Sequence, residues 1–360
     1  MPSSSQTITY NTVAALALDK LSPIVADNIS TGTKLFYFLK KKGNWEGTAY
    51  GGRQLRKAVM STLAPLKPLG AFGTVNVNPI DGDTAAYFPW VQTAAPISFA
   101  DMEEFQTGGT ESIEAIVDSK RRQAEASLID LFNQSLLRGQ ASIDGVSITT
   151  PLTSTVDGSV FIDPLPLMIK KDPTTSTTYG GIDAGANPWW RNQVYDSSAA
   201  TMGAFLNELR TLHIRCQRGG GGAGSAPDFH VADERTFALY EKSLALTHRN
   251  PDYGKGDIPF DTVMFKGKPA FPDEHVPDVQ NSVINIETND KGTWYMGNSE
   301  WMGFMFDSRK SFKVGDSIRP NNQLLTTALM PVRGTFWCNN RRKLGVVFDI
   351  DLNTVEAAAT

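Results

Sequence analysis

Cysteine and histidine are scarce in this chain, and neither is spaced as a metal site requires. Its 360 residues include two cysteines, Cys216 and Cys338. Two cysteines make neither a disulfide framework nor a four-cysteine zinc site, and the sequence contains no HExxH or similar histidine pair. The sequence therefore predicts two free thiols that are buried or half-buried, histidines in structural or exposed positions, and neither a metal nor a cofactor. The four histidines are His213, His230, His248 and His275.

Long apolar runs are also missing. No stretch approaches the roughly 18 to 20 apolar residues that cross a bilayer. The N-terminus, Met1-Pro2-Ser3-Ser4-Ser5, lacks the charged and apolar regions of a secretory signal. We therefore expect a protein that is made and folded in a cytoplasm, with no membrane partner.

A strong charge of either sign is absent as well. The net charge is -4, and 20% of the residues are charged. A dedicated nucleic-acid binder normally carries a basic stripe or patch, so this balance argues against that class. A mildly acidic wall that surrounds nucleic acid without gripping its phosphates remains compatible with it.

The glycine-rich tract at residues 218–225 is the nearest approach to a catalytic or phosphate-binding motif. It follows an expected helix and precedes an expected strand, which is the reverse of a Walker loop, and no Lys-Ser or Lys-Thr closes it. The same order of elements excludes a dinucleotide fingerprint, and no GxSxG elbow is present. We therefore predict a loop here, no catalytic residues, and no enzymatic activity.

Helices and strands interleave without the regular alternation of a doubly wound sheet, which predicts an α+β fold. The clearest element is a helix whose apolar residues recur at helical spacing from Ile113 to Leu136. About 27 residues at ~1.5 Å each make a rod of roughly 40 Å. Helices are also expected over residues 198–215 and 235–246, and strands over 228–232, 262–265, 283–287, 292–296 and 335–349.

Residues 47–91 predict a long, irregular β-hairpin. Gly51-Gly52 precedes a strand over 53–60, a turn falls at 79–83, and an extended run covers 87–91. The hairpin has few core residues for its length, and such a hairpin gains stability only on another surface. Residues 1–45 show helical spacing only around 13–18 and 35–39. They pack either on a neighbouring subunit or as an arm on their own domain.

Several stretches of the sequence occur in the order typical of one family. They are Gly51-Gly52; residues 90–98 followed by Glu103-Glu104; Gly108-Gly109 before the long helix with Ala124-Glu125; residues 180–183 with 190–193; residues 227–231 with 264–269; and residues 339–345. On these stretches, from about residue 45 to 350, the chain resembles the major capsid proteins of tailed bacteriophages with the Hong Kong 97-type fold. Within them it resembles the siphovirus-like group.

The resemblance implies a layout and a function. The layout is an N-terminal arm (1–45), an extended β-hairpin loop (46–92), a peripheral domain (93–195 and 310–360) with a spine helix at about 112–138, and an axial domain (196–309). The function is self-assembly into hexamers and pentamers of an icosahedral head, located in the virion and enclosing double-stranded DNA without sequence-specific binding. Candidate inter-subunit contact residues are Arg53, Arg56, Lys57, Tyr87, Trp90, Glu103, Glu104, Arg121 and Arg122.

The resemblance also bears on partners. Some relatives carry a long N-terminal scaffolding region that is cut away, whereas only about 45 residues precede the hairpin here. Either a separate scaffolding protein assists assembly or the sequence is a processed form, and the initial Met1 favours the former. A portal and a decoration protein are further expected partners. Lys57, Lys67 and Asn353 make no convincing match to the Lys–Asn isopeptide motif of some relatives, so we predict no covalent cross-link.

Two other functions remain open at this point. An encapsulin-like nanocompartment shares the fold but encloses enzyme cargo, and a neighbouring portal or terminase gene would decide against it. A cytoplasmic α+β enzyme with scattered site residues would remain a small oligomer with a defined pocket, whereas a capsid subunit forms rings or shells.

Overall fold

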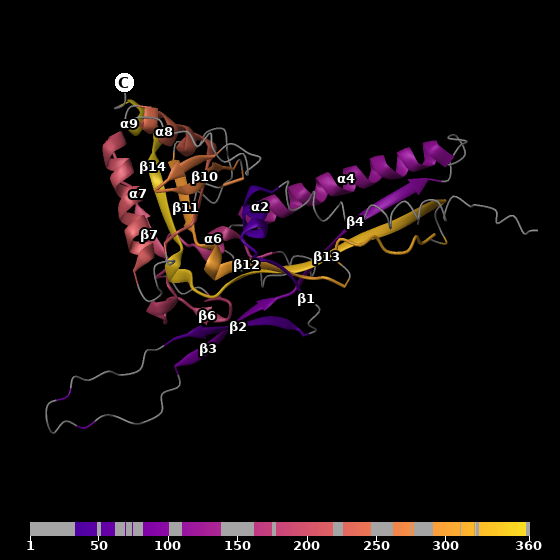
Figure 1. The fold of residues 1–360 in the computed structure, drawn as a ribbon, viewed down its shortest axis with the longest axis horizontal. Coiled ribbons are helices and arrows are strands. Elements are labelled where there is room, and N and C mark those ends of the chain that lie inside the picture. The colour runs from indigo at the N-terminus through magenta and orange to yellow at the C-terminus, as the bar shows by residue number, and fades with distance from the viewer. Residues whose placement is uncertain are drawn as a thin grey trace, which may run out of the picture.

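The structure is a computed structural model, and it describes most of the chain in separate ranges. These are residues 33–48, 52–61, 82–100, 110–137, 162–174, 178–218, 226–245, 262–273, 275–276, 291–309, 311–319 and 324–357, with residues 69, 74 and 321. Figure 1 shows two bodies of secondary structure, one built on a six-stranded sheet and one drawn out into a long arm, with a hairpin projecting below them.

The six-stranded sheet has the order β7-β14-β11-β8-β10-β9. Its strands are β7 (Gln193–Asp196), β14 (Gly345–Asp351), β11 (Lys291–Gly297), β8 (Phe229–Ala232), β10 (Lys268–Pro272) and β9 (Val263–Phe265). Helices α7 (Met202–Gln217), α8 (Glu234–Ala245) and α9 (Leu352–Ala357) accompany it. Phe205 and Leu209 of α7 are fully buried in one apolar cluster with Trp294 and Val347 of the sheet, which fixes the helix on it.

The arm consists of a four-stranded sheet and one long helix. The sheet order is β1-β12-β13-β4, formed by β1 (Trp45–Thr48), β12 (Met302–Asp307), β13 (Leu325–Cys338) and β4 (Val91–Ala100). Helix α4 (Thr110–Leu137) runs along β4. Its residues Val117, Ala124, Leu128 and Phe132 are buried and recur every four or seven positions, so one stripe of the helix meets the sheet.

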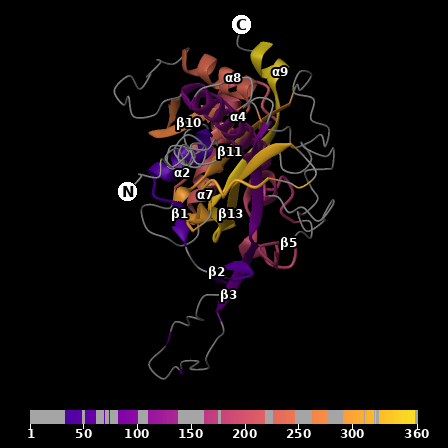
Figure 2. The ribbon, with the colours of Figure 1, turned by 90° about the vertical axis from the view of Figure 1, so that its right-hand side faces the viewer.

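The projecting hairpin pairs β2 (Gln54–Met60) with β3 (Asp83–Pro89) in an antiparallel register. Figures 1 and 2 both show it pointing away from the two sheets. Beside its base lie β5 (Thr178–Tyr179) and β6 (Ile182–Asp183). The remaining elements are the short helix α6 (Leu165–Met168) and the 3₁₀ helices η1 (Pro188–Trp190), η3 (Ser299–Trp301) and η4 (Arg341–Lys343).

The described part of the N-terminal region packs inside the same subunit. Helix α2 (Lys34–Lys41) buries Phe36, whose ring lies 5.0 Å from that of Phe304 and 5.9 Å from that of Phe132. Strand β1 then pairs parallel with β12. Of the two alternatives for this region, residues 33–48 therefore follow the second and pack on their own chain. The expected helical spacing at 13–18 lies outside the described residues.

The expected helices and the hairpin strands are confirmed, with small shifts of their ends. The strand expected over 335–349 is instead two strands, because η4 turns the chain between β13 and β14. These two strands join different sheets: β14, placed in the peripheral domain by the resemblance, pairs with β11 and β7, whereas β12, placed in the axial domain, pairs with β13. Hydrogen-bonded strands therefore come from segments that lie far apart in the sequence. The strand expected over 283–287 lies outside the described residues.

Candidate subunit-interaction surfaces

The base of the hairpin is anchored to the subunit. The buried ring of Phe88 lies 5.4 Å from that of Tyr179, and the backbone N–H of Tyr87 donates to the carbonyl of Gly180 at 2.9 Å. Gly180 has a φ of +63°, and a Cβ there would meet the Cβ of Ala86 at 3.0 Å. Because the left-handed backbone and the close approach both favour glycine, this Gly-Gly turn suits the contact with the hairpin.

The opposite face of the hairpin points to solvent. Tyr87 is 44% exposed and pairs with Arg56, whose guanidinium lies 6.0 Å from the centre of the Tyr87 ring. Met60 and Arg53 are also exposed. Exposed tyrosine, methionine and arginine side chains are typical of protein interfaces. This outward face is therefore the hairpin's candidate contact surface.

Lys57 lies on the inner face and contacts its own subunit. Its ammonium group is 3.8 Å from the centre of the Trp337 ring, on β13. Burial lowers the pKa of Lys57, and the nearby Glu46 carboxylate acts in the opposite direction. The side chain thus ties β2 to the four-stranded sheet, a contact that the sequence pattern did not indicate.

The two arginines expected at an interface occupy different environments on α4. Arg121 is only 4% exposed, and its guanidinium contacts Glu125 at 2.6 Å and Asp118 at 2.9 Å. Its hydrogen bond is the main cause that lowers the pKa of Asp118. The Arg122 side chain is 73% exposed and reaches Asp118 at 2.7 Å. Only Arg122 of this pair presents its guanidinium to solvent. Trp90 is half-buried between β3 and β4, and Glu103 and Glu104 lie outside the described residues.

The arm carries an exposed apolar strip that the sequence reading did not single out. Leu324 is 78% exposed, and Ile318 and Leu329 are exposed as well. Leu329 pairs with the exposed Pro96 of β4, whereas its neighbour Met330 is buried. Residues 325–332 therefore bear apolar side chains on both faces of β13. Such a strand is typical of a sheet that is covered on both sides. This pattern in the sequence could have indicated the apolar strip.

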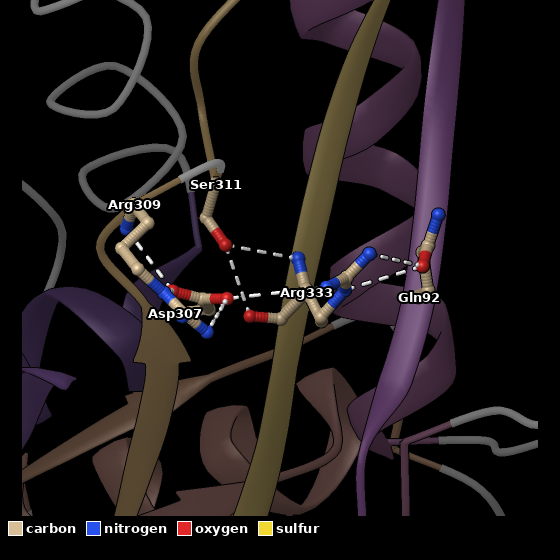
Figure 3. A network of polar contacts seen from close by, with 5 residues as sticks. All are labelled: Gln92, Asp307, Arg309, Ser311 and Arg333. Atoms are coloured by element: carbon tan, nitrogen blue, oxygen red, sulfur yellow. Dashed lines mark hydrogen bonds and ion pairs between the residues drawn. The ribbon is translucent and has the colours of Figure 1, made fainter. Parts of the chain in front are cut away.

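A polar network links β12, β13 and β4, as Figure 3 shows. The carboxylate of Asp307 accepts from Arg309 at 2.9 and 3.0 Å and lies 3.9 Å from Arg333. Arg333 donates in turn to Gln92 Oε1 at 2.8 and 3.2 Å. The Ser311 hydroxyl accepts from the Arg333 amide and donates to its carbonyl, each at 3.0 Å. Arg309 is the main cause of the lowered pKa of Asp307.

The described residues contain no group of three or more histidine, cysteine, aspartate or glutamate side chains that could hold a metal ion. Burial, followed by repulsion from nearby cations, lowers the pKa of His213 to about 4 and that of His230 to about 3. Burial likewise raises the pKa of both thiols, Cys216 and Cys338, to about 12. His213 and His230 are therefore neutral, and the thiols of Cys216 and Cys338 are protonated, at pH 7. None of the described helices combines the length and apolarity needed to cross a membrane.

Comparison with solved structures identifies the fold. No family model and no curated protein sequence matches the chain. Among solved structures, the capsid asymmetric unit of cyanophage A-1(L) matches with a TM-score of 0.55 and 12% identity, over 98% of this chain and 95% of that one. The capsid of a native GTA particle matches with a TM-score of 0.51 and 10% identity, over 86% and 89%. This chain has the Hong Kong 97-type capsid fold.

Two of the elements described above correspond to named parts of the Hong Kong 97-type fold. Helix α4 is the spine helix, and the β2–β3 hairpin is the extended loop. The holo-SrpI encapsulin complex from Synechococcus elongatus also matches, with a TM-score of 0.46 and 12% identity, over 88% of this chain and 89% of that one.

Proposed function

We propose that this chain is the major capsid protein of a tailed bacteriophage, which assembles into hexamers and pentamers of an icosahedral head. The observation that carries this proposal is the fold shared with a cyanophage capsid subunit along 98% of this chain. A fold alone does not determine function, so the proposal also depends on the surfaces that the fold presents.

Those surfaces suit assembly. The hairpin projects from the body and exposes Arg56, Tyr87 and Met60 on its outward face. The arm exposes Leu324 and Leu329. In the proposed shell, the hairpin lies over an adjacent subunit and the apolar strip is covered by a neighbour. Each contact contributes a modest binding free energy, and a closed shell is stable because many copies of each contact form together.

We further propose a layout close to the one that the resemblance implied. Residues 1–45 are the N-terminal arm, with 33–45 held on the subunit itself, and residues 46–92 are the extended loop. The peripheral domain is built on β4, β12, β13 and α4, and the axial domain on the six-stranded sheet. This assignment moves β12 and β14 across the expected boundaries, because hydrogen-bonded strands belong to one sheet.

The proposed role requires no catalysis. The subunit's first partner is a second copy of itself. A separate scaffolding protein, a portal, and a decoration protein are further proposed partners. The shell would be assembled in the host cytoplasm, become part of the virion, and enclose double-stranded DNA without reading its sequence. The net charge of -4 is consistent with a wall along which packed DNA slides.

Electron microscopy of the purified chain tests this proposal. The protein is expressed alone and with its scaffolding protein, separated by size-exclusion chromatography and imaged in negative stain. Shells, tubes, or free hexamers and pentamers are the expected result. A clean monomer or dimer in both preparations contradicts it and favours a small-oligomer enzyme. Closed shells that retain a cellular enzyme as cargo contradict it in favour of a nanocompartment.

A further inference from the structure

A basic hollow lies on the body of the subunit, beside the base of the hairpin. It measures about 420 Å³, and its lining includes Pro173, Pro188, Trp189, Arg191 and Arg342. Trp189 contacts the buried Trp190, whose indole N–H donates to the Tyr179 carbonyl at 3.1 Å. Tyr179 also packs on Phe88 of β3, so a chain of aromatic contacts links Trp189, at the edge of the hollow, to the base of the hairpin.

The positive charge around this hollow is not neutralised within the described part of the chain. Arg191 donates to the carbonyls of Ala184 and Gly185 rather than to a carboxylate. Arg342 is exposed, and among the described residues it forms no ion pair. Arg342 also contributes to lowering the pKa of the adjacent Lys343, after the larger effect of burial.

The buried guanidinium next to the hollow adds to this excess. Arg341 is fully buried, and its Nη1 has no hydrogen-bond partner among the described residues. Its Nη2 donates to Asn192 Oδ1 at 3.3 Å, and Asn192 lines the hollow. Buried cations that lack a counter-charge favour an anionic ligand close by.

The lining of the hollow favours a peptide over a duplex. The backbone of a duplex presents phosphates and sugars, and it has no large apolar group to place against Trp189 and the two prolines. Two prolines and a tryptophan beside two guanidiniums suit a segment that carries carboxylates next to apolar side chains, because the ring and prolines accept the apolar part and the arginines the carboxylates.

Such a segment occurs in this chain. Residues 101–105 read Asp-Met-Glu-Glu-Phe, with three carboxylates, two large apolar side chains and no cation. Their own subunit's hollow is out of reach. Figure 1 shows β4 ending and α4 beginning at the far end of the arm, with α6 at the opposite end of α4. Lys170 lies two residues after the end of α6, and its amide donates to Asn192 Oδ1 at 3.1 Å, so the hollow lies at that opposite end.

The length of α4 is greater than the distance that residues 101–109 can reach. Helix α4 has 28 residues and so spans ~42 Å at ~1.5 Å per residue. Residues 101–109, anchored at both ends, extend at most roughly 16 Å from the tip of the arm at ~3.5 Å per residue. We propose that the hollow at Trp189, Arg191 and Arg342 binds residues 101–105 of a second copy of this chain. This inference rests on the proposed function, because it names the surface through which neighbouring subunits meet.

A charge exchange tests the contact directly. Arg342→Glu reverses the charge in the hollow, and Glu103→Lys with Glu104→Lys reverses it in the segment. Each change alone is expected to reduce the yield of particles at least tenfold, measured by sedimentation and negative-stain microscopy at low salt. All three substitutions together are expected to restore the yield to within twofold of the wild type. Lys313→Glu, at an exposed lysine on the arm, is the control for net charge and is expected to leave the yield unchanged.

Several outcomes would overturn the inference. Wild-type yield from Arg342→Glu, absence of rescue in the combined variant, or an equal loss in Lys313→Glu each does so. Normal particles of Arg342→Glu that retain less DNA would assign the hollow to phosphates instead. The particle yield of the wild type is measured first and separately. If the wild type forms no particles, the proposed function fails and this inference fails with it. If Arg342→Glu alone is insoluble, the segment variant and Arg342→Gln give the same comparison.

Discussion

Arg121 and Glu125 form a buried ion pair on one turn of the spine helix, with Arg121 Nη1 2.6 Å from Glu125 Oε1. Both side chains are at most 6% exposed, and Asp118 completes the group at 2.9 Å. Removing one member of a buried pair leaves an uncompensated charge and costs about 3 to 5 kcal/mol. We expect Glu125→Ala to lower the free energy of unfolding by about 3 kcal/mol, because Asp118 still compensates part of the Arg121 charge.

Arg122 provides the matched control for this prediction. It lies next to Arg121 on α4, and its 73% exposed side chain also pairs with Asp118. Exposed ion pairs contribute up to about 1 kcal/mol, so Arg122→Ala should change the denaturant midpoint only slightly. Urea unfolding of the soluble subunit, followed by circular dichroism, measures both variants. Equal losses in the two would contradict the distinction drawn between a buried and an exposed arginine.

The hairpin predicts two opposite effects at adjacent residues. Tyr87 faces solvent, so Tyr87→Ala should leave the unfolding curve nearly unchanged while reducing the yield of assembled particles. Phe88 is fully buried against Tyr179, so Phe88→Ala should destabilise the subunit by about 3 to 5 kcal/mol. Thermal melts and particle yields, measured on the same preparations, separate the two. Normal assembly by Tyr87→Ala would remove the outward face from the proposed interface.

How far the sequence predicts this molecule depends on how local the signal is. The spine helix follows from apolar residues at helical spacing, and the hairpin from its turn residues. The position of Arg121 was predictable too: it falls four residues after Val117 and three before Ala124, on the buried stripe. The membership of β14 was not predictable, because Val346 and Val347 pair with strands that lie far away in the sequence.

The basic hollow marks a second limit of sequence reading. Trp189, Arg191 and Arg342 come from segments about 150 residues apart, and only the pairing of β7 with β14 brings η1 and η4 together. The apolar strip on β13 was accessible in principle, because residues 325–332 place apolar side chains on both faces of the strand. An apolar face that stays exposed in the described part of the chain is the trace expected of a contact with another subunit.

Gly334, where the long strand β13 is paired with both β4 and β12, gives a third prediction. Gly334 pairs with Val91 of β4 on one side and with Phe306 of β12 on the other. A Cβ there would lie 2.4 Å from Phe304 Cζ, in the fully buried core. Overpacking of this kind costs about 1 to 3 kcal/mol, so Gly334→Ala should lower the melting temperature of the subunit by several degrees.

Gly203 is the control for that substitution. It lies in the first turn of α7, with no atom within 4 Å of the Cβ position. Alanine reduces the conformational freedom of the unfolded chain, so Gly203→Ala should be neutral or raise the melting temperature slightly. Differential scanning fluorimetry on the two variants suffices. A Gly334→Ala protein as stable as Gly203→Ala would mean that Phe304 moves aside at little cost.

The two buried histidines predict how stability depends on pH. In the folded protein, burial lowers the pKa of His230 to about 3 and that of His213 to about 4, below the usual value of 6.5. Between these values the unfolded chain binds protons that the folded chain does not. Stability from this source is therefore present above pH ~6.5 and is lost as the pH falls toward 4 and then 3.

Substitution of His230 isolates its contribution to the pH dependence of stability. Its Nδ1 accepts from the Trp294 indole N–H at 3.4 Å, and glutamine keeps an acceptor for that donor. We expect the free energy of unfolding of His230→Gln to fall less steeply than that of the wild type between pH 6.5 and 4, because one fewer buried imidazole takes up a proton on unfolding. Urea titrations at half-unit pH steps measure both slopes. Identical slopes would show that the imidazole reaches solvent in the folded state, since only a desolvated ring resists protonation there.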